Sequence, residues 1–158
     1  MPPIIVKSWI KPTVVDTPLF TAPGRSYIKP EPLGVIAVLG AWSYPISTLV
    51  GPLAEIISAG NCMLIKPSEI APNCSRALTK LCQKYLDNRF YIPYQGQTEV
   101  AKQITSMKWD MIVFTGSPEK GKLVAAAAGK NLVPCLLELG GKCPTIIDES
   151  ADANFAAK

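Results

Sequence analysis

The chain has 158 residues, of which 48% are apolar and 18% are charged. This length and composition are typical of one folded domain and exclude a disordered chain. The formal net charge is +4, but the Lys and Arg residues are scattered and form no run with stacking aromatic residues. We therefore expect no nucleic-acid partner.

The chain contains no histidine, which excludes Ser-His-Asp and Cys-His nucleophile systems and His-ligated zinc within it. We expect no metal site. The five cysteines include no Cys-x-x-Cys pair, and an odd number without a signal peptide predicts reduced thiols. The expected location is intracellular, in the cytoplasm, with an organelle as the alternative.

Residues 1–32 hold seven prolines and show little helical periodicity. This composition predicts an extended arm with room for one edge strand. Residues 32–54 then carry no charge, and their length raises the question of a transmembrane span. Prolines 45 and 52 and three glycines interrupt that stretch, so we expect a buried strand, a turn and a buried helix, and no membrane span.

From residue 33 onward, predicted strands alternate with predicted helices. The strands are expected at 34–39, 61–65, 90–93, 111–114 and 133–137, with a further strand starting at 145–147. The helices are expected from Pro45 to Gly60, along an apolar stripe over 77–86 that buries Cys82, and over 98–104 and 117–128. This alternation predicts an α/β fold with a doubly wound parallel sheet.

Glu138 lies among leucines in the stretch 136–142 and is followed by Gly140 and Gly141. Loss of solvation would raise the pKa of this carboxylate and suit it to act as a general base. The two glycines would permit a positive φ or a close approach of the main chain to a ligand. The alternative is that Glu138 simply points outward from a strand.

The segment 115–122 is predicted to join a strand to a helix, with Ser117 as the N-cap and Pro118 in the first helical position. Such a helix N-terminus suits a phosphate group. The spacing of Gly116, Gly121 and Lys122 approaches a Walker A motif, but the next residue is Leu123 instead of Ser or Thr, which disfavours an NTPase. An ordinary capped helix is the alternative.

Lys66 and Glu69 follow the second expected strand at its carboxyl end, where doubly wound sheets bind nucleotides. Both side chains could reach ribose hydroxyls, and Glu69 would repel a 2′-phosphate, which favours NAD over NADP. The Gly-x-Gly-x-x-Gly fingerprint is missing from the first turn after a strand, residues 40–45. A standard Rossmann domain is therefore disfavoured.

Six short motifs occur in the order and at about the spacings seen in aldehyde dehydrogenases, and the chain most resembles the class 3-like, fatty-aldehyde branch. They are Glu31-Pro-Leu-Gly34, Trp42-Ser-Tyr-Pro45, Gly60-Asn61, Lys66-Pro-Ser-Glu69, Phe114-Thr-Gly-Ser117 with Gly121, and Glu138-Leu-Gly-Gly-Lys142. The resemblance implies a Rossmann-like coenzyme domain and NAD(P)-dependent oxidation of an aldehyde to an acid. A cysteine thiolate attacks the carbonyl, hydride passes to the nicotinamide, and water activated by glutamate releases the acyl group.

The resemblance also implies roles for single residues. Glu138 is similar to the family's general base, and Lys66 and Glu69 resemble its adenosine-ribose contacts. Ser117 would face the pyrophosphate. The cleft would be shaped by Gly116, Gly121, Leu139 and Gly140. Ser43 stands where the family has an asparagine that donates to the oxyanion, and its alternative role is to cap the helix near Pro45.

The family's nucleophilic cysteine lies beyond the glutamate motif, and no cysteine of this chain matches its context. Cys143 is nearest, but we expect it to pack in the core or at a sheet edge.

The expected domains are an arm (1–32), an NAD(P)-binding domain (33–137) and a truncated start of a catalytic domain (138–158). The protein is thus either the coenzyme-binding half of an aldehyde dehydrogenase-like enzyme or a pseudoenzyme that acts as a binding or structural subunit. The coenzyme is NAD, with NADP possible. An aldehyde is the substrate once the remaining half is supplied, and a protein partner or an oligomer is expected.

Overall fold

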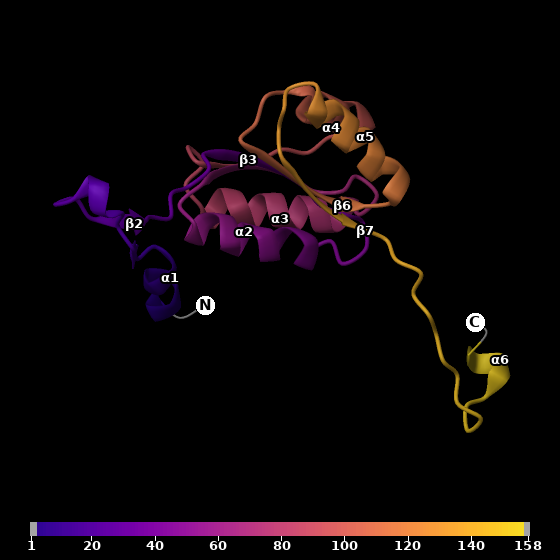
Figure 1. Cartoon of the computed structure of the whole chain (residues 1–158). Coiled ribbons are helices and arrows are strands. Elements are labelled where there is room, and N and C mark those ends of the chain that lie inside the picture. The colour runs from indigo at the N-terminus through magenta and orange to yellow at the C-terminus, as the bar shows by residue number, and fades with distance from the viewer. Residues whose placement is uncertain (1–2, 157–158) are drawn as a thin grey trace.

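The computed structural model describes residues 3–156, and its centre is a five-stranded parallel sheet with helices on both faces (Figure 1). The strand order is β5-β4-β3-β6-β7, so the chain crosses from one half of the sheet to the other between β5 and β6. The strands are β3 (Val35–Leu39), β4 (Cys62–Lys66), β5 (Tyr91–Pro93), β6 (Met111–Gly116) and β7 (Cys135–Leu139). The predicted α/β fold with a doubly wound parallel sheet is confirmed.

Two helices cover each face of the sheet (Figure 1). One face carries α2 (Ser47–Ser58) and α3 (Pro72–Tyr85), and the other carries α4 (Thr98–Ser106) and α5 (Pro118–Gly129). Successive side chains of a strand point to opposite faces, so β3 supplies Ile36 and Val38 to one apolar core and Ala37 and Leu39 to the other. The central strand is therefore buried on both sides, as its continuous apolar run predicted.

Polar contacts fix the start of β3 at the amino edge of the sheet. The Asn61 side chain accepts a hydrogen bond from the Gly34 amide at 2.9 Å, and Asp110 accepts one from the Val35 amide at 2.7 Å. Helix α2 ends at Ser58, and Gly60 follows it with a positive φ of 80°, as predicted for a glycine that ends a helix. The predicted start of α2 at Pro45 is wrong, because the helix begins at Ser47 and Pro45 lies in the preceding turn.

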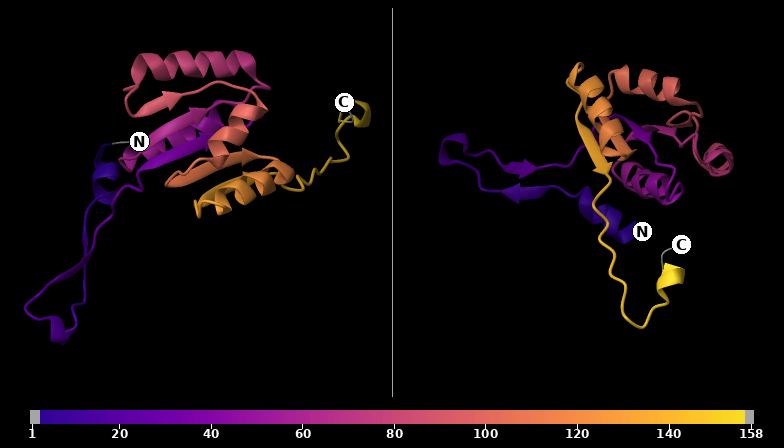
Figure 2. Two further views of the ribbon diagram at one scale, coloured as in Figure 1. Left: turned by 90° about the horizontal axis from the view of Figure 1, so that it is seen from above. Right: turned by 90° about the vertical axis from the view of Figure 1, so that its right-hand side faces the viewer.

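The N-terminal arm projects away from the sheet (Figure 2). It contains α1 (Pro3–Trp9), a 3-10 turn (Leu19–Thr21) and an antiparallel pair of strands, β1 (Thr13–Val15) and β2 (Ser26–Ile28). The prediction of an extended arm with one edge strand therefore missed a helix and a second strand. The reason is that the prolines lie outside the paired strands, and a proline in the first turn of a helix costs no hydrogen bond.

The predicted strand from residue 145 is wrong. Past β7 the chain leaves the sheet (Figures 1 and 2) and forms no strand among the described residues up to Ala156, with only the short helix α6 (Ala153–Ala156) near its end. Ile146 is 96% exposed. An apolar sequence adopts a strand only where its backbone finds a partner, and none of the described residues pairs with this one. None of the described helices is both long enough and apolar enough to span a membrane.

Candidate functional site at the carboxyl edge of the sheet

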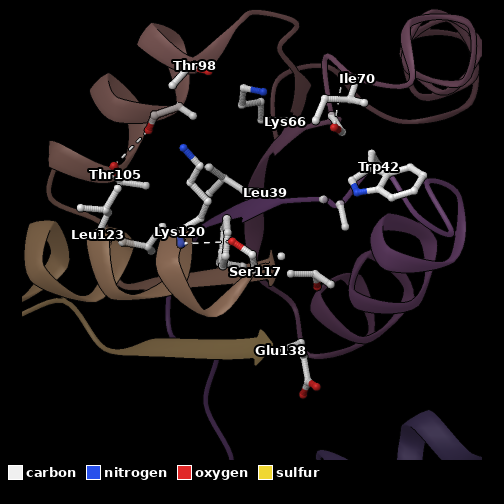
Figure 3. A pocket seen from close by; sticks show the side chains of 18 of the residues that line it. Leu39, Trp42, Lys66, Ile70, Thr98, Thr105, Ser117, Lys120, Leu123 and Glu138 are labelled. Carbon is white, nitrogen blue, oxygen red and sulfur yellow. Dashed lines mark hydrogen bonds between the residues drawn. The ribbon is translucent and has the colours of Figure 1, made fainter. Parts of the chain in front are cut away.

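A cavity of about 940 Å³ opens at the carboxyl ends of β3, β4, β6 and β7 (Figure 3). This is the edge at which open parallel sheets bind ligands, and the volume is typical of a ligand site. The cavity brings together all but one of the residues predicted from sequence to form a site: Ser43, Lys66, Glu69, Gly116, Ser117, Glu138, Leu139 and Gly140. The exception, Gly121, lies buried in α5 and does not line the cavity.

Lys66 ends β4 with its side chain buried, and Glu69 lies on the loop that follows. The Lys66 Nζ donates to Glu69 Oε2 at 2.8 Å and to the carbonyl oxygen of Pro67 at 3.2 Å. Partial burial acts to raise the pKa of Glu69, but hydrogen bonds from Lys66 and the backbone, together with the charges of Lys66 and Lys120, outweigh it and hold that pKa below its usual value. The pair therefore presents an ammonium and an ionised carboxylate together at one end of the cavity.

Ser117 is the N-cap of α5, as predicted. Its Oγ accepts a hydrogen bond from the Lys120 amide at 3.3 Å, and Pro118 occupies the first turn. The first amides of α5 and its positive dipole end lie beside the cavity, where an anionic group would be stabilised.

Two glycines allow close packing, because a Cβ at either position would press on a neighbouring leucine. A Cβ on Gly121 would lie 2.6 Å from Leu139 Cδ2, which explains why α5 can pack closely against β7. A Cβ on Gly40 would lie 2.6 Å from Cγ of the buried Leu49. Neither Gly140 nor Gly141 has a positive φ, so that part of the prediction is wrong, whereas a close approach of their main chain to a ligand stays a prediction. A Cβ on either would meet no protein atom closer than 3.8 Å. They lie where the chain leaves the sheet, so no packing constrains them.

Glu138 lies near the end of β7, opposite Thr115 of β6, and lines the cavity at the far side from Lys66 (Figure 3). It also lines a second hollow of about 380 Å³ beside α2. The prediction that its leucine neighbours remove its solvation is wrong, because Glu138 is exposed. Among the described residues β7 is an edge strand, so Leu136 and Leu139 are themselves about two-fifths exposed and do not cover the carboxylate.

Ser43 lies in the turn between β3 and α2, with its side chain exposed at the rim of the cavity. The alternative that it caps α2 is wrong, because the helix begins four residues later and no side chain caps its first residue. The structure thus leaves Ser43 facing the same space as Glu138.

The family model described as "Aldehyde dehydrogenase family" matches residues 10–158. The chain belongs to the aldehyde dehydrogenase family. An aldehyde dehydrogenase of Craterostigma plantagineum is 43% identical over 95% of this chain and 31% of its own length. Mouse aldehyde dehydrogenase family 3 member B2 is 40% identical over 96% of this chain and 32% of its own. The predicted class 3-like resemblance is thereby confirmed, and the chain spans about a third of these relatives.

Solved aldehyde dehydrogenases share the fold. The substrate-bound AldH of Staphylococcus aureus superposes with a TM-score of 0.84 at 41% identity, over 93% of this chain and 32% of its own. The Mycobacterium tuberculosis aldehyde dehydrogenase complexed with NAD+ has a TM-score of 0.73 at 31% identity, over 83% and 27%. The succinic semialdehyde dehydrogenase of Streptococcus pyogenes, in complex with NADP+, has a TM-score of 0.76 at 25% identity, over 94% and 32%.

The family resemblance implies a nucleophilic cysteine, but no cysteine of this chain lines the cavity. Cys143 is exposed with φ of 46°, so the prediction that it packs in the core or at a sheet edge is wrong. Cys82 is buried in the core, as predicted, and burial raises the pKa of its thiol. No group of three or more potential metal ligands occurs within residues 3–156.

Sequence reasoning missed much of the cavity wall. Trp42 and Ile70 lie on one side, whereas α4 and α5 line the other (Figure 3). The missed residues of α4 and α5 are Thr98, Ala101, Lys102, Thr105, Lys120, Leu123, Val124 and Ala127. Only Lys120 had a usable signal, since it lies one helical turn after the predicted N-cap Ser117.

Proposed function

We propose that the protein oxidises aldehydes to carboxylic acids with NAD(P), and that this chain supplies the coenzyme cleft and the general base. One observation carries the proposal: a single cavity joins Lys66, the N-terminus of α5 and Glu138. Lys66 suits the adenosine ribose of a dinucleotide, and the N-terminus of α5 suits its pyrophosphate. Glu138 suits the place where the nicotinamide and the substrate would react. Solved relatives in complex with NAD+ or NADP+ support the choice of coenzyme.

The residues at the carboxyl edge fit a dinucleotide. Lys66 uses two of its three N–H donors within the described residues, which leaves one for a ribose hydroxyl. Glu69, held ionised beside it, can accept from the same sugar. The free amides of α5 and the Ser117 hydroxyl suit the pyrophosphate. The bound coenzyme would accept the hydride that leaves the substrate.

The reactive end of the proposed site holds Glu138 and Ser43. The Glu138 carboxylate borders both the large cavity and the second hollow. It can therefore take a proton from a water molecule that attacks an acyl group held where the two spaces meet. Ser43 can donate its hydroxyl proton to a developing oxyanion, although the side chain is shorter than asparagine and rotates freely.

The nucleophilic thiolate would come from outside the cavity described here, since none of the five cysteines lines it. We accordingly propose residues 33–137 as the coenzyme-binding domain and residues from 138 as the start of a catalytic domain. Ser43, which stands where the family has an asparagine that donates to the oxyanion, favours a second candidate function, in which the protein is a pseudoenzyme that binds coenzyme or another subunit without turnover.

A chimera tests the first proposal. Residues 31–158 would replace the matching segment of the Staphylococcus aureus AldH, which is 41% identical to this chain, and NADH formation would be followed with aliphatic and aromatic aldehydes. We expect turnover in the chimera and a fall of about 100-fold or more for Glu138→Gln, because a positioned general base contributes at least that much.

Glu149→Gln is the matched control, since Glu149 is exposed and does not line the cavity. It should leave turnover unchanged. An active chimera in which Glu138→Gln and Glu149→Gln behave alike would reject Glu138 as the base, and a folded chimera without turnover would favour the pseudoenzyme.

A further inference from the structure

Lys120 adds a positive charge to the wall of the coenzyme cavity without forming an ion pair among the described residues. It lies in the first turn of α5, lines the cavity opposite Trp42 (Figure 3), and forms no ion pair within residues 3–156. The other two lysines of the cavity wall are paired. Lys66 contacts Glu69 at 2.8 Å, and Lys102 contacts Glu99 at 2.8 Å.

The charge of Lys120 acts at the adenosine end of the cavity. It helps to lower the pKa of Glu69, so the ammonium lies close enough to that carboxylate for their charges to interact. Glu138, the only other carboxylate among the described cavity residues, lies at the far end (Figure 3). Near the Lys66–Glu69 pair, the cavity therefore carries one net positive charge.

We propose that Lys120 binds the 2′-phosphate of NADP, so that the cleft accepts NADP as well as NAD. This inference rests on the proposed coenzyme site and assigns a specificity-determining residue within it. A 2′-phosphate carries roughly two negative charges near neutral pH. Glu69 alone would repel it, but Lys66 neutralises Glu69, and Lys120 then supplies the attraction. A lysine ammonium serves well as a point-charge ligand of phosphate.

Lys120 could instead contact the pyrophosphate, because it lies one turn from Ser117. The two roles have different consequences. A pyrophosphate ligand would serve NAD and NADP equally, whereas a 2′-phosphate ligand would serve NADP alone. The ratio of the two affinities therefore distinguishes them.

The test is calorimetric titration of NAD and NADP into the purified chain and its variants. We expect wild-type Kd values for the two coenzymes to lie within about tenfold of each other, since a charge-assisted hydrogen bond offsets the repulsion from Glu69. Lys120→Gln should raise the Kd of NADP by about tenfold or more and change that of NAD by less than about twofold. Lys120→Arg, which keeps the charge, should retain NADP binding.

Lys122→Gln is the matched control, because Lys122 lies on the same helix, is exposed and does not line the cavity. It should bind both coenzymes as the wild type does. Exclusion of NADP by the wild-type chain, equal losses of both coenzymes in Lys120→Gln, or unchanged NADP binding in that variant would each overturn the inference while the coenzyme site stands. Binding of neither coenzyme to the folded wild type would reject the coenzyme site and the inference together.

Discussion

The two ends of the cavity are built in different ways. At the adenosine end, Lys66 ends β4, a strand with neighbours on both sides, and its side chain is 4% exposed. At the other end, Glu138 lies on β7, which has one neighbour among the described residues, and its side chain is exposed. Burial and a hydrogen-bonded partner thus hold Lys66 on the inner strand, whereas backbone pairing alone places Glu138 on the outer strand.

The largest effect should come from the buried sheet itself. Met63 lies on β4 three residues before Lys66 and is 1% exposed, whereas Ile146 follows β7 and is 96% exposed. We expect Met63→Ala to lower the free energy of unfolding by about 2–5 kcal/mol, because it leaves a cavity in the core. Ile146→Ala should change it by less than about 0.5 kcal/mol. Urea denaturation measures both, and similar losses would show that the segment after β7 also contributes to the core.

A second effect separates the two ends by their part in coenzyme binding. Lys66→Met keeps the volume of the side chain but removes the ammonium that contacts Glu69, so NAD affinity should fall by at least about tenfold. Glu138→Gln should change NAD affinity by less than about twofold, because the carboxylate lies at the reactive end. Calorimetric titration of NAD measures the affinities. Lys80→Met, at an exposed position on α3, is the control. Equal losses in Lys66→Met and Glu138→Gln would contradict the division.

The strands of this sheet could be predicted because buried parallel strands are short, continuous apolar runs, such as residues 35–39. The N-cap at Ser117 could be predicted because its local chemistry does not depend on distant residues. The exposure of Glu138 could not, since two flanking leucines say nothing about whether β7 is covered. The course of residues 145–147 could not either, because an apolar sequence indicates a strand but not the presence of a pairing partner.

A third effect concerns the reactive end. In the chimera that carries residues 31–158 in the Staphylococcus aureus AldH, Ser43→Asn should raise turnover by roughly tenfold or more with little change in the KM for aldehyde, because a longer, better-positioned amide improves oxyanion stabilisation. Steady-state kinetics measure it. The change Ser106→Asn, at an exposed position at the end of α4 that does not line the cavity, controls for the added amide. Equal rates for Ser43 and Ser43→Asn would show that this position does not limit the reaction.

The smallest effect is a proton equilibrium at the adenosine end. Because the folded pKa of Glu69 is lowered from 4.5, the stabilisation from its pairing is present above that pH and is lost as the pH falls through the folded value. Carboxyl-carbon NMR should show Glu69 titrating below 4.5, and its midpoint should rise in Lys66→Met. An unchanged midpoint in that variant would mean that Lys66 does not hold the carboxylate ionised.

If the cavity at the carboxyl edge of the sheet binds NAD(P), an NAD titration should shift the amide resonances of the residues around it. The largest shifts should fall in two segments distant in sequence, residues 66–70 and 116–121, which border the same cavity. The β1–β2 strand pair of the arm should show no shift. Shifts confined to the arm or to the amino ends of the strands, or none at saturating NAD, would contradict the claim.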